Sequence, residues 1–219
     1  MKLTQKLKNA AVPIWNKIYN TPFVEELCKG TLPHKKFRFF VIHDYNYLIA
    51  SIKNFSILAA KANSVNNMQL LSEIAREEAK TELGGYKNYL KQLEIPLDEV
   101  VKAEPTFLET SYTNFLLSAS LMKSFAEGIT AVLPCYWTYS EIAKFHKENI
   151  INNPNKIYRE WASLYLDEEY LLVVDKIKTI VNKIDPEFSY AKLEKIFIQS
   201  SKYELLFWQA AYKMEEWPL

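Results

Sequence analysis

Hydrophobic residues along the chain recur at the spacing of one helix face rather than in the alternation typical of strands. Leu3, Leu7 and Ala11 already show this spacing near the start, and such steps are typical of amphipathic helices. Residues 36–62 carry apolar side chains on almost every face, which predicts a helix buried in the middle of a bundle. The whole pattern predicts helices over 3–20, 23–29, 36–62, 67–93, 108–126, 130–149, 155–164, 167–183 and 190–215. We therefore expect an all-α fold.

Prolines lie in the gaps between these predicted helices and restrict the residue before each of them. They are Pro33, Pro96, Pro105, Pro154 and Pro186. Only four glycines occur, and no Asn-Gly or Asp-Gly pair indicates a hairpin. Residues 94–107 form the longest predicted connection and are a candidate to close over a ligand. A pocket in such a protein has to lie between helices, so site side chains should point inward from several of them.

A chain of 219 residues can bury its own core and is short for two independent domains, so we expect a single domain over residues 1–219. The net charge of +1 is too small to attract a polyanion, so neither nucleic acid nor a membrane is expected as a partner. No apolar run reaches the ~18 residues of a membrane-spanning helix. The N-terminus lacks the apolar stretch of a signal peptide, so the expected location is the cytoplasm.

The two cysteines, Cys28 and Cys135, lie far apart in a chain without a secretion signal, so no disulfide is expected. Pro134 directly precedes Cys135, which predicts that a helix breaks or begins there. Backbone N–H groups freed at such a point would favour the thiolate over the thiol. Cys28 has no comparable neighbours and is interpreted as structural.

The histidines do not form a metal-binding pattern. His34, His43 and His146 lie on separate segments, and no Glu-x-x-His pair occurs to place two ligands on one helix face. We therefore expect no metal and no other cofactor.

Two carboxylates lie among apolar residues of the sequence. Burying a carboxylate costs free energy unless it is paired or has a function. Asp44 stands within FRFFVIHDYNYLIA and Glu204 within YELLFWQAAY. The alternative is that each simply faces water from a helix surface. Asp44 and Tyr47, at i,i+3, and Cys135 and Tyr139, at i,i+4, share helix faces, which favours the functional interpretation.

Five segments together resemble the TenA/thiaminase II family over nearly the whole chain. They are HDYNYL at 43–48, YTNFLL at 112–117, LPCYWTYSEIA at 133–143, YREWASLY at 158–165, and YELLFWQAAY with the terminal EEWP. The resemblance implies one haem-oxygenase-like helical domain, an aminopyrimidine hydrolase of thiamin salvage, and a homotetramer. Tyr86, Tyr89 and Phe107 are expected as exposed aromatics that fit the interface between subunits.

By matching position, the resemblance makes Cys135 the nucleophile and Glu204 its proton-transfer partner. The residues implied in substrate binding are Asp44, Tyr47, Tyr112, Tyr139, Tyr165 and Phe207. The implied substrates are 5-aminomethyl-4-amino-2-methylpyrimidine and thiamin, which yield hydroxymethylpyrimidine plus ammonia or the thiazole. The chain departs from many relatives at His43, where they have Gln, and at Tyr86, where they have His.

Two other interpretations stay open. One is a non-catalytic binding or regulatory protein of the same fold, which binds thiamin or a pyrimidine without turnover and would not need both Cys135 and Glu204. The other is a haem or di-iron oxygenase of the same fold, which the absent ligand pattern disfavours.

Overall fold

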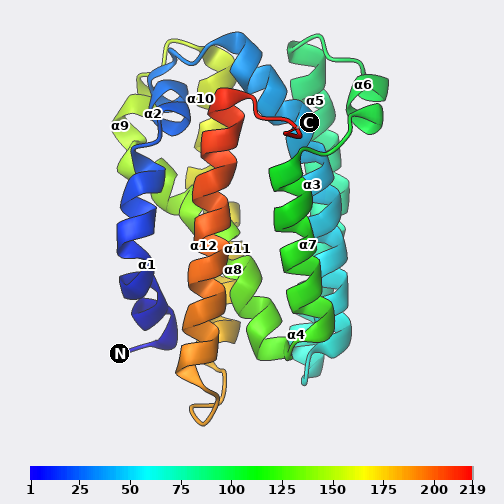
Figure 1. Ribbon diagram of the computed structural model, residues 1–219, viewed down its shortest axis with the longest axis vertical. Helices are drawn as coiled ribbons and strands as arrows, with labels where there is room; N and C mark the ends of the chain where they lie inside the picture. The colour runs from blue at the N-terminus through cyan, green and yellow to red at the C-terminus, as the bar shows by residue number, and fades with distance from the viewer. Residues whose placement is uncertain (219) are drawn as a thin grey trace. The chain divides into compact units, whose positions relative to one another are not determined.

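The computed structural model describes residues 1–218, apart from the side chains of residues 81–85. The described chain is helical and contains no β-strand, so the all-α prediction is confirmed (Figure 1). Its elements are α1 (Leu3–Tyr19), α2 (Pro22–Lys29), α3 (His34–Lys61), α4 (Val65–Glu77), the π-helical η1 (Glu78–Glu82), α5 (Leu83–Gln92), α6 (Leu97–Lys102), α7 (Phe107–Met122), α8 (Phe125–Phe145), α9 (Lys147–Ile151), α10 (Lys156–Ser163), the 3-10 segment η2 (Leu164–Leu166), α11 (Glu168–Asn182) and α12 (Tyr190–Lys213). None of the helices described here is long and apolar enough to cross a membrane.

The helices fall into two compact units by their contacts. Unit 1 comprises Met1–Leu32 and Ala126–Gln209, and unit 2 comprises Pro33–Phe125 and Ala210–Leu219. Each unit is described by itself below. A single domain over residues 1–219 stays a prediction.

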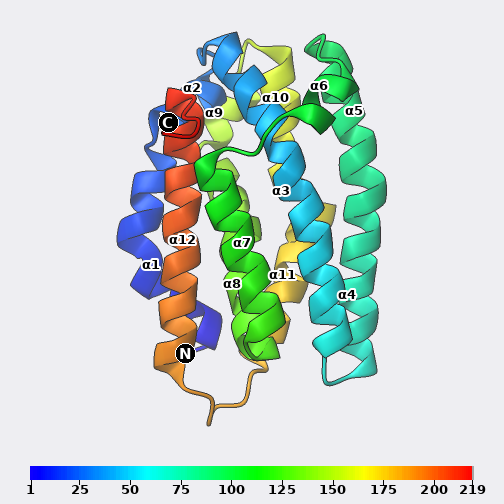
Figure 2. The same ribbon diagram turned by 45° about the vertical axis from the view of Figure 1, so that its right-hand side comes forward.

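In unit 1, α12 turns one face inward along its whole length. Leu193, Phe197, Ser201, Glu204 and Trp208 follow one another at steps of three or four residues, and all are buried. Helix α1 lies beside α12 (Figures 1 and 2), where the Trp15 indole donates a 3.0 Å hydrogen bond to the Ser201 hydroxyl. The buried face therefore includes hydroxyl groups and a carboxylate among its apolar side chains.

The loop before α10 is tied to the end of α2. The Asn153 side chain donates to the Leu27 and Cys28 carbonyls at 2.8 and 2.9 Å, which satisfies groups left free where α2 ends. Gly30 follows α2 with a φ of 79°, in the left-handed region that favours glycine. A Cβ atom at Gly30 would lie 2.4 Å from Asn153 Oδ1. This junction fixes the start of α10.

In unit 2, α3 is the central helix and contacts both α4 and α7 (Figure 2). Residues 36–52 of α3 include no fully exposed side chain, but most of them are half-buried, and Lys53, Ser56 and Ala60 are exposed, so the predicted burial of residues 36–62 holds only in part. At the other end of α3, the Lys61 ammonium donates to the Ser120 carbonyl at 2.6 Å, among the last carbonyls of α7. A cation at this point complements the helix dipole.

Three predictions from the sequence differ from the structure. The predicted 94–107 loop contains α6, because Pro96 and the acidic Asp98 and Glu99 start a short helix. The predicted helix 67–93 includes the π-helical η1. Tyr86 is buried, with its hydroxyl donating to the Val41 carbonyl, so its predicted role as an exposed interface aromatic is wrong.

Candidate active site

Helix α8 carries Cys135 and runs unbroken through Pro134. The prediction that a helix breaks or begins at Pro134 is therefore wrong. Pro134 lacks an N–H, so the Thr130 carbonyl loses its usual partner in the helix, while the next carbonyl, that of Ala131, accepts a 2.7 Å hydrogen bond from Ser200 of α12. Contact with α12 thus supports the helix where the proline weakens it. Cys135 lies in the middle of α8, so no helix N-terminus stabilises its thiolate.

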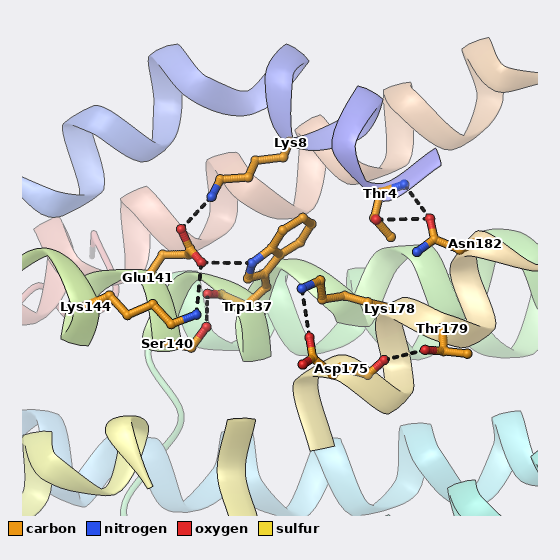
Figure 3. Close-up of polar contacts among 10 residues, drawn as sticks. All are labelled: Thr4, Lys8, Trp137, Ser140, Glu141, Lys144, Asp175, Lys178, Thr179 and Asn182. Atoms are coloured by element: carbon orange, nitrogen blue, oxygen red, sulfur yellow. Dashed lines mark hydrogen bonds and ion pairs between the residues drawn. The ribbon is translucent and has the colours of Figure 1, made fainter. Parts of the chain in front are cut away.

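One face of α8 is anchored to α1 within unit 1. Figure 3 shows Glu141 accepting hydrogen bonds from Lys8 at 2.5 Å and from the Trp137 indole at 3.2 Å. Burial raises the pKa of Glu141, but Lys8, Lys144 and the indole outweigh it and leave the pKa below its ordinary value. The Lys178 ammonium of α11 lies 4.7 Å from the Trp137 ring centroid. These contacts fix the rotation of α8 about its own axis.

The other face of α8 presents Cys135, Thr138 and Tyr139, which are spaced at i, i+3 and i+4. Cys135 is 9% exposed, and Glu204 of α12 is 2% exposed. The Thr138 hydroxyl lies 3.3 Å from the Cys135 carbonyl oxygen and 3.3 Å from Glu204 Oε2. The structure thus links the backbone at Cys135 to the Glu204 carboxylate through the Thr138 hydroxyl, which the sequence analysis did not identify.

Aromatic rings surround this face of α8 in unit 1. Tyr139 lies 4.8 Å from Tyr165 and 5.1 Å from Trp208, measured between ring centroids. Trp161 of α10 lies 4.9 Å from Tyr165, and Phe207 packs 6.3 Å from Trp208. The structure brings together the predicted Tyr139, Tyr165 and Phe207, and it adds the two tryptophans. Tryptophan at helix spacing looks like core in a sequence, so no pattern in the sequence singled them out.

A small cavity lies behind these rings. Its volume is about 10 Å³, roughly the room that one water molecule needs. Tyr139, Trp161, Tyr165 and Trp208 line it together with Cys28. Burial raises the pKa of the Cys28 thiol to about 12, and Lys29 only partly opposes this. Cys28 is therefore a neutral thiol that packs as an apolar group, as its structural interpretation predicts.

The remaining predicted residues lie in unit 2. Tyr47 of α3 and Tyr112 of α7 are both buried, and their ring centroids are 5.5 Å apart. Asp44 is half-buried one turn before Tyr47 on α3. Burial raises the pKa of Tyr86, and the negative charge of Asp44 raises it further, so these two side chains interact electrostatically. The structure thus groups Asp44, Tyr47 and Tyr112 on two contacting helices.

His43 lies against a second buried carboxylate in unit 2. Its Nδ1 atom is 3.4 Å from Glu109 Oε2, and its ring stacks 4.3 Å from Phe39. Burial raises the pKa of Glu109, while His43 and the Thr106 backbone N–H lower it in part. Glu109 and Thr106 also form the capping box that starts α7. The His43 ring therefore lies beside a buried carboxylate, one residue before Asp44 in the chain.

Metal-ligating side chains do not cluster in the part of the chain that the structure describes. No group of three or more His, Cys, Asp or Glu side chains there could hold a metal ion. His146 instead forms a 2.8 Å hydrogen bond with the Tyr19 carbonyl, which is a packing role.

The chain is similar to known proteins over nearly its whole length. A protein-family model described as the TENA/THI-4/PQQC family matches residues 8–214. A protein of Halalkalibacterium halodurans named aminopyrimidine aminohydrolase is 32% identical over 220 residues, covering 99% of this chain and 98% of that protein.

Two solved structures share the fold. One, described as a TenA homologue from P. horikoshii OT3, superposes with a TM-score of 0.94 at 39% identity and covers 97% of this chain and 99% of its own. The other is a domain from Shewanella denitrificans OS217 with a heme oxygenase-like fold, which superposes with a TM-score of 0.79 at 12% identity over 98% of this chain and 93% of its own. The predicted haem-oxygenase-like helical fold is confirmed.

Proposed function

This chain belongs to the TENA/THI-4/PQQC family, and on that premise we propose that it is an aminopyrimidine hydrolase of thiamin salvage that uses Cys135 and Glu204. The observation that carries the proposal is the linkage in unit 1, where Thr138 lies 3.3 Å from both the Cys135 carbonyl and the Glu204 carboxylate. A pyrimidine binder needs neither a thiol nor a buried carboxylate at this point.

The proposed reaction has two steps, because a nucleophile divides one difficult displacement into two easier ones. The Cys135 thiolate adds to an electron-poor carbon of the pyrimidine ring while Glu204 delivers a proton to a ring nitrogen. The bond from the 5-methylene carbon to the amine or thiazole then breaks. Water adds to that carbon and gives up one proton, to the departing amine to form ammonia or, with thiamin, to solvent. Glu204 takes the proton back from the ring nitrogen as the thiolate leaves, which restores the aromatic ring.

Glu204 suits proton transfer because it is buried and its carboxylate contacts the Thr138 hydroxyl, beside the segment of α8 that carries Cys135. Tyr139, Tyr165 and Phe207 offer aromatic surface on the same side of α8, which suits a flat ring. Asp44, Tyr47 and Tyr112 are proposed to bind substrate through the resemblance and the polar groups they carry.

The proposed substrates are 5-aminomethyl-4-amino-2-methylpyrimidine, which would release ammonia, and thiamin, which would release its thiazole. The test is to incubate the purified full chain with each compound and to separate the products by chromatography. Hydroxymethylpyrimidine from either compound supports the proposal, and the relative rates identify the preferred substrate. Binding by calorimetry without any product would instead indicate the non-catalytic, regulatory alternative, and neither binding nor product would overturn both.

A further inference from the structure

Thr138 occupies a position on α8 from which its hydroxyl reaches both the Cys135 segment and the Glu204 carboxylate. It is fully buried, and both contacts measure 3.3 Å. A threonine in a helix commonly donates to the carbonyl three or four residues earlier, so the contact with Cys135 alone would be unremarkable. The contact with the carboxylate of α12, 66 residues away, is not explained by helix geometry.

A hydroxyl group has one proton to donate and lone pairs that accept. When Glu204 is ionised, Thr138 can donate to Oε2 in a charge-assisted hydrogen bond. When Glu204 is protonated, its own O–H can donate to Thr138 Oγ1, and Thr138 then donates to the Cys135 carbonyl. The same three groups therefore form hydrogen bonds in both protonation states of the carboxyl. A lysine or a backbone N–H at this place would favour the ionised state alone.

From this geometry we propose that Thr138 is a positioning residue that holds the Glu204 carboxyl beside the Cys135 segment and sets its proton affinity. This inference rests on the proposed function in one respect, namely that Glu204 gives and takes a proton during turnover. The hydrogen-bond arrangement itself does not depend on which pyrimidine is the substrate.

Other groups that bear on Glu204 in unit 1 come from three helices. Titratable side chains within one turn of the pair on α8 and α12 are Cys135, Tyr136, Tyr139, Glu141, Lys202 and Tyr203. Glu141 accepts hydrogen bonds from Lys8 and the Trp137 indole on the other face of α8. Lys202 is exposed, so its charge is screened by water. On α1, the side chain that bonds to this part of α12 is Trp15, which does not titrate. The Thr138 hydroxyl donates to Glu204 Oε2 from α8 and thereby favours the ionised form of the carboxyl group.

Thr138→Val tests the inference because valine has nearly the same shape and lacks the hydroxyl. Loss of a hydrogen bond to the charged form raises the pKa of a carboxyl group. We expect the pKa of Glu204 to rise by about one pH unit, a tenfold change in proton affinity. The acid limb of the kcat profile should move up by the same amount, so kcat measured on that limb, below the wild-type pKa, should fall about tenfold while kcat on the plateau and KM stay within about twofold. Thr138→Ser, which keeps the hydroxyl, should restore both values.

Thr130→Val is the matched control. Thr130 is also fully buried on α8, and its hydroxyl donates only to the Ala126 carbonyl, at 2.7 Å. This variant removes a threonine hydroxyl from the same helix without touching the carboxylate. It should leave the pKa of Glu204 and the pH profile unchanged, even if it lowers the melting temperature.

The pKa of Glu204 can be measured without turnover, from the infrared carbonyl band of its protonated form, which is assigned by its loss in Glu204→Gln. If the wild-type protein hydrolyses no aminopyrimidine, the proposed function fails, and this titration still decides the role of Thr138. An unchanged pKa in Thr138→Val, or an equal shift in Thr130→Val, would overturn the inference. Thr138→Ala provides a second hydroxyl-free variant if Thr138→Val does not fold.

Discussion

The two cysteines should differ sharply in their reaction with iodoacetamide, because Cys28 is held as a neutral thiol by its surroundings whereas Cys135 is the proposed nucleophile. Cys28 is 1% exposed and lines the small apolar cavity of unit 1. Burial raises its pKa from 9.0 to about 12. Since the thiolate is the reactive form, three pH units lower the reactive fraction about a thousandfold at pH 8. Exclusion of the reagent by packing slows the reaction further.

The assay is alkylation of the native protein at pH 8, followed by mass spectrometry of the two cysteine peptides over time. We expect Cys135 to be modified and Cys28 to remain free over the same period, with bound aminopyrimidine protecting Cys135. The control is the protein unfolded in urea, where both thiols should react at similar rates. Native Cys28 that reacts at its unfolded rate would refute the account of its burial, and protection of Cys28 rather than Cys135 by substrate would reverse their assigned roles.

Three substitutions extend these tests. Asp44→Asn keeps a hydrogen-bonding group but loses its charge, so steady-state kinetics should show a higher KM and a lower kcat, together about 2 kcal/mol; wild-type kinetics would place Asp44 outside the reaction. Gly30→Ala should lower the free energy of unfolding by at least about 1–2 kcal/mol in urea denaturation, because its φ is 79° and its Cβ would clash with Asn153. Glu141→Gln should cost about 0.5–1 kcal/mol at pH 7, the range for a partly exposed ion pair such as that with Lys8. Because the pKa of Glu141 is lowered in the folded protein, its ion pair stabilises the fold above the unfolded pKa, and this stabilisation is lost as the pH falls through the folded pKa. The free energies of unfolding of the variant and the wild type should therefore become equal in acid.

Helix content could be predicted from the sequence because apolar spacing and proline positions act locally. Pro33 and Pro96 stand at helix N-caps, where their fixed φ is compatible with the first turn. Pro134 has the same local chemistry but lies inside α8, where packing against α12 and the Ser200 hydrogen bond outweigh its cost. That compensation comes from a segment 66 residues later in the chain, so no local rule could reveal it.

The candidate site could be predicted only in part, for the same reason. Cys135 and Tyr139 share a helix face by spacing alone, and that relation holds in the structure. The spacing also places Thr138 on this face, and this was the one feature of the sequence that could have indicated its role. Its contact with Glu204 depends on how α8 and α12 pack, as do the positions of Trp161 and Trp208 around Tyr139. Residues that act through tertiary contacts leave little trace in a single sequence.

The most direct test of the proposed mechanism is the turnover of Cys135→Ser on 5-aminomethyl-4-amino-2-methylpyrimidine, with Cys28→Ser as the matched control. A serine hydroxyl preserves packing but is a far poorer nucleophile than a thiolate at neutral pH. We expect Cys135→Ser to bind the pyrimidine and to lose kcat by roughly a thousandfold, about 4 kcal/mol of barrier. Cys28→Ser should keep its activity. Turnover by Cys135→Ser within a few-fold of the wild-type rate would contradict the assignment of Cys135 as the nucleophile.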